Sequence, residues 1–482
     1  MLPATLRLPA ALILLPFITP ASLPRQAAPC IRLDHAGIQV QGEVQICPGR
    51  YRVADPREQG VIVIASSRTR LDLTGVILES GDSMPENFRG IGIVSRNVDQ
   101  VTITGGTIRG YRYGVLLEGG RGHEVRGTDV SGSRQQQLMS DSAGFVESDW
   151  LDIFHPDTFE TYGAGLYLRN TSDAVVTGVT ARQAQNGIGL FNVRESYIAD
   201  NDVSHNSGWG IHLWHSSRNV ISRNDASYNV RCESPAYSRG CDSAGLLLRQ
   251  RSDSNLISNN DLTHSGDGFF LSGQRGQVQP SIGNVVVRND GSFAYHNAFE
   301  STFSAWNVFL ENRADSSRYG FWLGYSTDNL VRGNTILGSI ETGIAIEHGS
   351  DNTIVANVII GGVTGIHLFA PHEGDQASRG YRVDDNTLAQ LRVGLLLERT
   401  TRSRIRGNLF DGVADGLVAD QAAADARVRG NIFLRARDHY IRADSLDAGD
   451  NFWGSPDLEA TRGLVSGDVS LTPWHPAREA GY

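Results

Sequence analysis

The sequence contains no lysine: all 43 basic residues of the 482-residue chain are arginine. A lysine base or a lysine Schiff base is therefore excluded, which removes several lyase mechanisms. Charge of either sign is sparse, because 20% of the residues are charged and the formal net charge is −10. We therefore expect no nucleic-acid partner, which would normally need a basic face, although local arginine clusters could bind acidic sugars.

Long hydrophobic runs are scarce as well. The N-terminus carries one, from Leu8 to Ile18, which follows Arg7 and precedes small residues. This pattern predicts a secretory signal peptide over residues 1–28, cleaved after Ala21 or Ala28, and the alternative is a buried first strand. Because no later run reaches about 18 apolar residues, we expect a secreted or periplasmic protein that does not bind the membrane once the signal is removed.

Cysteine is limited to four residues in two local pairs, Cys30 with Cys47 and Cys232 with Cys241. In an exported chain these pairs predict two short-loop disulfides, since neither spacing matches a zinc knuckle. Pairing by proximity is one of three connectivities that four cysteines allow. Free buried thiols are the alternative.

Glycine, in contrast, is abundant at 54 residues, which suits a β-rich chain with many turns. A short phrase of the type "VRGNTI" recurs along the chain, mostly at intervals of 22 or 23 residues, and the longer intervals indicate inserted loops. Its asparagines are Asn201, Asn224, Asn260, Asn289, Asn312, Asn334, Asn357, Asn386, Asn408 and Asn431.

In the corresponding phrases nearer the N-terminus, glycine stands where the later phrases have asparagine, at Gly75, Gly106, Gly127 and Gly178. A second phrase, such as "YGVLLEG" or "TGIHLFA", precedes each of these positions. Short strands joined at a turn asparagine predict an all-β fold, a single-stranded right-handed parallel β-helix built as a solenoid of 22–23-residue coils. A leucine-rich repeat lacks support because the L-x-x-L-x-L consensus is missing, and a propeller would need units of about 40 residues.

The phrases "NTIVANVIIGGVTGIHLF" and "NLVRGNTI" resemble the repeats of NosD-type and pectate-lyase-like exported β-helix proteins, and "DNFWGSPDL" resembles their closing segment. The resemblance runs from about Ile38 to Asp457. It implies the fold but no single activity, because that superfamily includes lyases, hydrolases, epimerases and binding proteins. Alginate epimerases of this fold carry a "DPHD" motif, whereas the nearest string here, "FHPDTF", lies in an inserted loop, so epimerase activity is not carried over.

The repeat divides the mature chain into three parts. Residues 29–74 form an N-terminal cap with the first coils, residues 75–450 form the β-helix, and residues 451–482 form a closing segment. Loops inserted in one stretch of a solenoid usually wall a binding site, although neutral surface insertions are the alternative. The predicted insertions are 134–163, 231–243, 273–283 and 370–380.

Alternation along each strand predicts which side chains face outward. When the second phrase is aligned on its glycine, the residues one and three positions later point into the core, and those two and four positions later point to solvent. On the middle coils the outward positions collect the side chains that a sugar chain needs for stacking and charged hydrogen bonds, although such residues also pack well on any exposed sheet. The predicted polysaccharide-binding residues are Tyr167, Arg169, His212, Trp214, Arg249, Phe270, His296, Trp322, Tyr325, His348 and His367.

Three carboxylates are candidates for catalysis. Glu300 and Glu347 lie two coils apart, so their backbones should be about 12 Å apart, and their side chains could reach the roughly 6.5–9.5 Å of an inverting glycosidase. Asp267, one coil before Glu300, could approach it to about 5 Å, the separation in a retaining enzyme. Each carboxylate could instead be a structural salt-bridge partner.

Two other functions stay open. A lyase would need a cation for the uronate and a base for the C5 proton, drawn from Arg169, Arg249, His212, His296 or His348, but the evenly mixed charge favours a hydrolase. A non-catalytic binding protein of the NosD type is the other alternative. No metal-type triplet appears in the sequence, so we expect no metal or cofactor, with Ca²⁺ at the acidic loop 149–160 left open, and a monomer that acts on a polysaccharide.

Overall fold

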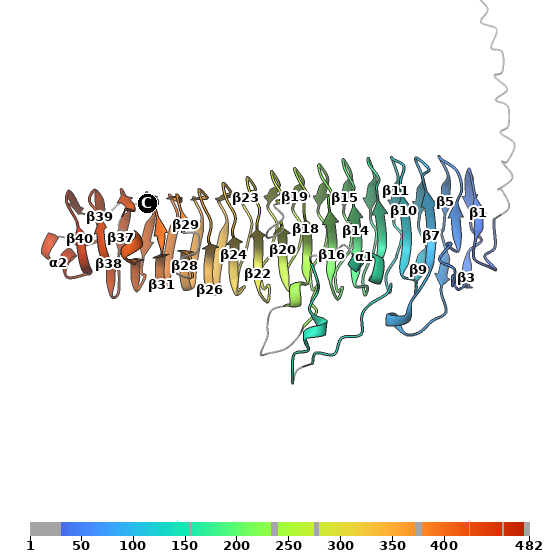
Figure 1. Ribbon diagram of the computed structural model, residues 1–482, viewed down its shortest axis with the longest axis horizontal. Helices are drawn as coiled ribbons and strands as arrows, with labels where there is room; N and C mark the ends of the chain where they lie inside the picture. Colours follow the sequence, from blue (N-terminus) through green and yellow to red (C-terminus); the bar gives the residue numbers. More distant parts are fainter. Residues whose placement is uncertain are drawn as a thin grey trace, which may run out of the picture.

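The computed structural model describes residues 30–141, 143–153, 157–232, 240–273, 279–371, 378–423, 425–455 and 457–476. These residues form one long stack of coils with the loops on one side of it (Figure 1). Both predicted disulfides, Cys30–Cys47 and Cys232–Cys241, are confirmed. The predicted signal peptide, residues 1–28, lies outside the described residues, and within them no helix has the length and apolar character to cross a membrane.

The longest sheet joins strands from successive coils, with two strands from a coil toward the C-terminal end, and its outward face is where the candidate site lies. Its strands are β1 (Ile38–Val40), β4 (Ile62–Ile64), β7 (Ile91–Arg96), β10 (Tyr113–Glu118), β12 (Ala164–Arg169), β14 (Asn186–Phe191), β16 (Trp209–Trp214), β18 (Ala244–Arg249), β20 (Asp267–Ser272), β22 (Asn297–Thr302), β24 (Tyr319–Gly324), β26 (Thr335–Glu347), β28 (Val358–Phe369), β31 (Thr387–Glu398), β34 (Leu409–Asp411), β35 (Asp415–Ala419), β37 (Ile432–Leu434), β38 (His439–Asp447), β39 (Asn451–Trp453), β40 (Val465–Ser470) and β41 (Trp474–Pro476).

A second sheet runs along another side of the coils. Its strands are β2 (Glu43–Gln45), β5 (Arg70–Asp72), β8 (Thr102–Thr104), β11 (Glu124–Arg126), β13 (Val175–Thr177), β15 (Tyr197–Ala199), β17 (Val220–Ser222), β19 (Leu256–Ser258), β21 (Val285–Val287), β23 (Val308–Leu310), β25 (Leu330–Arg332), β27 (Thr353–Val355), β30 (Arg382–Asp384), β33 (Arg404–Arg406) and β36 (Arg427–Arg429). Short pairings complete the coils in β3 (Gly49–Arg52), β6 (Val76–Glu79) and β9 (Thr107–Arg109), and in β29 (Ser378–Arg379) with β32 (Thr400–Thr401). The α-helices are α1 (Asp157–Tyr162) and α2 (Leu458–Arg462).

The register confirms the predicted alternation between core and outward face. Phe270 of β20 pairs with Glu300 of β22, which pairs with Trp322 of β24, all in parallel. The neighbouring inward residues Phe299 and Phe321 are fully buried and stack with their ring centroids 4.9 Å apart. The coils therefore bury one continuous apolar core, which a single coil could not do alone.

The repeated asparagines form a continuous ladder along one turn. The Asn334 Nδ2 donates to Asn357 Oδ1 at 2.9 Å, and the backbone N–H of Asn312 donates to Asn334 Oδ1 at 2.8 Å. The same bond links each predicted asparagine to the next, from Asn201 through Asn431 to Asn451. The ladder confirms the sequence period and gives the buried turn its hydrogen-bond partners.

The inserted loop 134–163 covers part of the longest sheet. Leu151 and Ile153 of this loop pack in one apolar cluster with Trp209, Leu247 and Phe270, which project from β16, β18 and β20. The outward face of these three coils is therefore buried beneath the loop. A further insertion, residues 80–89 with a short 3₁₀ turn at Pro85–Asn87, was not predicted from the sequence.

Candidate functional site

Six of the predicted polysaccharide-binding residues are buried, so the expectation that they are exposed is wrong. Five of them point outward from their strands as the register requires, but the inserted loop and neighbouring side chains cover them. These five are Tyr167, His212, Trp214, Arg249 and Phe270, and the sixth is His348, directly after β26; each is at most 4% exposed.

The accessible part of the outward face begins at β22. Phe270 is 4% exposed, whereas Glu300, the next residue in the same column, is half-buried, as is Trp322 after it. From there an aromatic run continues along the face: the ring centroids of Tyr319 and Trp322 are 4.8 Å apart, and those of Trp322 and Phe369 are 6.0 Å apart. The sequence pointed to Trp322 but missed Tyr319 and Phe369.

Three carboxyl groups meet where this accessible face begins. Atoms of Asp267, His296 and Glu300 that could bind a metal lie within 4.8 Å of one another. Asp267 is 1% exposed; its Oδ1 accepts the backbone N–H of Asn297 at 2.9 Å, and its Oδ2 has no hydrogen bond within the described part of the chain. The predicted approach of Asp267 to Glu300 is therefore present.

The third carboxyl group, Asp242, was not predicted. It follows Cys241 of the second disulfide, in the predicted loop 231–243. Two tryptophans hold it, because Trp150 Nε1 donates to Asp242 Oδ2 at 2.8 Å and Trp209 Nε1 donates to the Asp242 backbone carbonyl at 2.8 Å. Two inserted loops thus bring Asp242 to the sheet, and in the sequence only its place beside a paired cysteine could have indicated it.

Burial and mutual repulsion change the acidity of this cluster. Burial, followed by the charges of Asp267 and Asp242, holds the pKa of Glu300 well above its usual value, although the Asn297 amide bond lowers it in part. Burial and the charge of Asp267 raise the pKa of Asp242 to about 7. At neutral pH the cluster can therefore hold a proton for donation, which an ordinary carboxyl group cannot.

Two of the basic residues predicted for a lyase lie beneath this surface. Burial lowers the pKa of Arg249 to about 10, and its Nη1 donates to the Gly273 carbonyl at 2.7 Å. Burial and the nearby Arg249 hold the pKa of His212 well below its usual value, so His212 is neutral at pH 7. Neither residue reaches the accessible face to neutralise a uronate, whereas His296 lies in the acidic cluster where that face begins.

Two further predicted residues, Arg169 and His367, lie outside the acidic cluster. Arg169 is half-buried and pairs with Glu160 at 3.0 Å, far along the sheet on β12. His367 Nε2 lies 2.8 Å from Glu398 Oε2, and its ring stacks on that of Phe369 at 4.1 Å. These contacts make Arg169 a surface ion-pair residue and His367 the end of the aromatic run.

Glu347 does not join the acidic cluster. Its register two coils beyond Thr302 agrees with the prediction, but its Oε1 lies 3.3 Å from Nδ1 of the buried His348. The His348 ring stacks on the exposed Tyr325 at 4.6 Å. Tyr325 stacks in turn on Phe303 at 5.0 Å. Because Glu347 contacts His348 directly, it is better placed to orient His348 than to pair with Glu300.

The group of Asp267, His296 and Glu300 offers two carboxylates and one imidazole, a donor set that suits a divalent transition metal. Asn297 Nδ2, however, donates to both Glu300 Oε2 and His296 Nδ1. Because an amide N–H already faces both atoms, this arrangement favours a proton-holding cluster over a cation site. In the loop 149–160, where Ca²⁺ binding was left open, Asp149 Oδ2 accepts the backbone N–H groups of Met139 and Ser140 at 2.9 and 2.6 Å.

Two family models match the chain. Residues 74–265 match the periplasmic copper-binding protein NosD, and residues 237–373 match the right-handed beta helix region. Within the described part of residues 74–265, no three His, Cys, Asp or Glu side chains bring ligand atoms together, so the residues present do not fit a copper site there. No curated protein matches the sequence significantly.

Several solved structures are similar to this chain. The A-module of the mannuronan C-5 epimerase AlgE6 from Azotobacter vinelandii is 14% identical over 81% of this chain and 90% of that chain, with a TM-score of 0.42. The periplasmic alginate epimerase AlgG is 14% identical over 77% of this chain and 73% of that chain, with a TM-score of 0.38. The Dettilon tailspike protein is 16% identical over 81% and 61%, with a TM-score of 0.37.

The parallel ladders, the asparagine turn and the two family matches agree with one another. The ladders join successive coils in the order that the sequence period predicts, and the family model that matches residues 237–373 is that of a right-handed beta helix. The chain is a right-handed parallel β-helix repeat protein.

Proposed function

We propose that the protein is an exported glycoside hydrolase, which cleaves a polysaccharide at the outward face where β20, β22 and β24 meet. The observation that carries this proposal is the half-buried Glu300, whose pKa is raised beside the buried Asp267 at the start of the aromatic run. A carboxyl group that keeps its proton at neutral pH is the usual acid of a glycosidase. The two disulfides and the match to a periplasmic family support a location outside the cytoplasm.

Each group in the cluster has a separate role in this proposal. Glu300 donates its proton to the glycosidic oxygen as the bond to the sugar carbon breaks. Asp242, with a pKa of about 7, is ionised above neutrality and accepts a proton from the attacking water. Asp267 is too buried to touch the substrate, so it is a positioning residue whose negative charge keeps the proton on Glu300. Trp322, Tyr319 and Phe369 offer stacking surfaces for the sugar rings.

The test is incubation of the mature protein with a panel of neutral and acidic polysaccharides, with and without EDTA. We expect new reducing ends, no ultraviolet absorbance from unsaturated sugars, and unchanged activity in EDTA. Absorbing products would instead establish β-elimination. A polysaccharide retained on a protein column but never cleaved would establish a binding protein.

Replacing Asp267 should move the pH dependence of the reaction. Asp267→Asn removes a negative charge that raises the pKa of Glu300, so that pKa should fall. Because Glu300 acts in its protonated form, activity is lost as pH rises through its pKa, and the alkaline limb of kcat/KM should move to lower pH. The control is Asp173→Asn, an exposed residue on another turn, which should leave the limb in place. A weaker enzyme with an unshifted limb would show a merely structural role for Asp267.

A further inference from the structure

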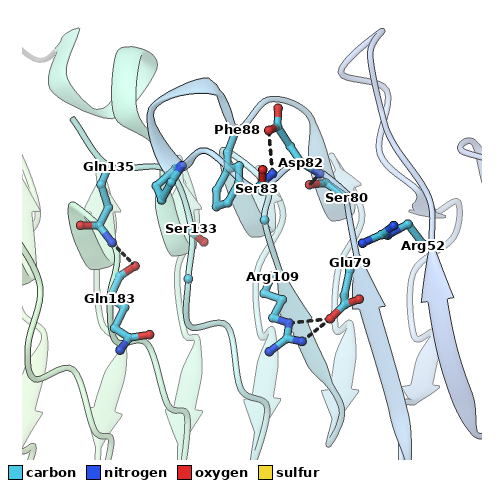
Figure 2. A pocket seen from close by; sticks show the side chains of 14 residues that line it. Arg52, Glu79, Ser80, Asp82, Ser83, Phe88, Arg109, Ser133, Gln135 and Gln183 are labelled. Carbon is cyan, nitrogen blue, oxygen red and sulfur yellow. Dashed lines mark hydrogen bonds and ion pairs between the residues drawn. The ribbon is translucent and has the colours of Figure 1, made fainter. Parts of the chain in front are cut away.

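Two adjoining cavities lie away from the catalytic cluster, along the N-terminal half of the solenoid. The larger, of about 510 Å³, lies between the insertion 80–89 and the ends of β6 and β9 (Figure 2). The smaller, of about 280 Å³, extends toward Tyr228 and Tyr295. Gln135 and Gln183 line both cavities, so the two form one trough, a term used here for these two cavities together.

Two insertions build the walls of this trough. Residues 80–89 form one wall, and the root of the inserted loop 134–163 forms the other. The backbone N–H of Gln135 donates to the Pro85 carbonyl at 3.3 Å, and that of Gln136 donates to Gln185 Oε1 at 3.1 Å. A plain coil has neither insertion, and loops that wall a concave surface on a solenoid are usually functional.

The lining has the chemistry of a sugar site. Gln135 Nε2 donates to the Gln183 backbone carbonyl at 2.6 Å, which fixes the amide side chain of Gln135 at one end of the larger cavity, as Figure 2 shows. Tyr228 and Tyr295 at the far end are 47% and 41% exposed. Amides that bond hydroxyl groups beside exposed aromatic rings suit a polyhydroxylated ligand better than an apolar one.

The opposite end of the larger cavity is lined by two arginines, Arg52 and Arg109, and two carboxylates, Glu79 and Asp82. Asp82 Oδ1 accepts two backbone N–H groups of its own loop. Arg109 and Arg50 both pair with Glu79 and lower its pKa, so Glu79 is ionised and already neutralised. Arg52 forms no ion pair among the described residues, and Figure 2 shows it on this side of the cavity beside Glu79. Such a guanidinium suits a carboxylate or sulfate group.

Gly81 makes room for this arginine. It has a φ of +90°, and a Cβ built there would lie 2.9 Å from Arg52 Cγ and 3.1 Å from its Cδ. The glycine therefore allows the stem of Arg52 to lie across the insertion at the rim of the cavity. Any other residue at position 81 would displace the arginine and strain the loop.

We propose that this trough is a second glycan-binding site, which takes an anionic stretch of a sugar chain with its acid group on Arg52. The site goes beyond the proposed hydrolysis and rests on it only in taking the ligand as a glycan. The trough ends at Tyr295, the neighbour of His296 in the acidic cluster. One long polysaccharide held at both places would gain affinity through the second contact without any new group at the catalytic cluster.

The test is calorimetric binding of two oligosaccharides of equal length, one of uronic acid units and one neutral, to the full chain carrying Glu300→Gln, which prevents cleavage. Adding Arg52→Ala should weaken binding of the acidic oligosaccharide about tenfold and leave the neutral one unchanged. Gln183→Ala should weaken both. The matched control is Arg70→Ala, an exposed arginine on β5 outside the trough.

Equal affinity of the Arg52→Ala and Arg70→Ala proteins for the acidic oligosaccharide would overturn the proposal, as would an acidic oligosaccharide that binds at a single place lost with Trp322→Ala. Far-ultraviolet circular dichroism and the unfolding midpoint show whether each variant is folded. Because binding is measured without cleavage, loss of the second site leaves the hydrolase proposal standing. If binding of the acidic oligosaccharide depends on Arg52 but the parent protein cleaves no polysaccharide, the hydrolase proposal is refuted and the second glycan-binding site is kept.

Discussion

Glu300→Gln should reduce kcat for polysaccharide cleavage about 10²- to 10⁴-fold, the usual contribution of a positioned general acid. Glutamine keeps the shape of the side chain and still accepts the Asn297 amide bond, but it holds no proton for the glycosidic oxygen. Glu300 is protonated and neutral at neutral pH, so a neutral glutamine leaves the charge of the acidic cluster unchanged. The variant should therefore fold about as stably as the parent and bind the glycan with similar affinity.

The matched control for this variant is Glu311→Gln. Glu311 follows β23 on the adjacent part of the same coil, is 56% exposed in its side chain, and pairs loosely with Arg288 at 3.8 Å. Its replacement should leave kcat within a factor of about two, because exposed ion pairs contribute little. A Glu300→Gln protein that retains full activity would end the acid assignment, and Glu347→Gln would then be the next variant to measure.

Asn334→Ala should lower the free energy of unfolding by about 2–4 kcal/mol, because the substitution leaves buried polar groups of neighbouring residues without hydrogen-bond partners. Asn334 Nδ2 donates to the Phe309 carbonyl at 3.1 Å, and Asn334 Oδ1 accepts the N–H of Asn312 at 2.8 Å. Alanine removes both contacts and interrupts the ladder in the middle of the stack. The measurement is the midpoint of urea-induced unfolding, with circular dichroism as the signal.

The control for the ladder is Asn87→Ala in the insertion 80–89. Asn87 is exposed and lies in the short 3₁₀ turn, so its replacement should change the free energy by no more than about 0.5 kcal/mol. Equal midpoints for the two variants would show that the ladder adds nothing beyond the packing of the core. A second transition at low urea in the Asn334→Ala protein would show that the two halves of the solenoid unfold separately at the break.

The fold could be predicted from the sequence because each coil repeats the same local requirements. The asparagines from Asn201 to Asn431 recur mostly at intervals of 22 or 23 residues, and the glycine-aligned phrase fixes which side of each strand faces the core. These patterns lie within single coils and recur along the chain, so they can be recognised directly in the sequence of a solenoid. A second ladder, from Asn219 through Asn255 and Asn284 to Asn352, was missed because its phrases vary more in their neighbours.

The candidate site was only partly predictable. Asp267 and Glu300 lie on neighbouring coils, so the register of the strands was enough to predict that the two side chains approach each other. The burial of His212 and Phe270 was not predictable, since it depends on how the loop 134–163 packs over the sheet. Asp242 was missed for the same reason: it is held by indole groups from two distant parts of the chain, which no period in the sequence records.

The asparagine ladder also fixes the unit by which the length of the molecule can change. Each asparagine donates to the next coil in the same direction, so the chain can lengthen or shorten without a break only by whole coils. Every added coil would extend the outward face by about 4.8 Å, while the loops that carry Asp242 and Gln135 lie off the ladder and can change freely. In the proposed function, reach along a sugar chain and chemistry at one point on it are therefore set by separate parts of the sequence, and either can vary without the other.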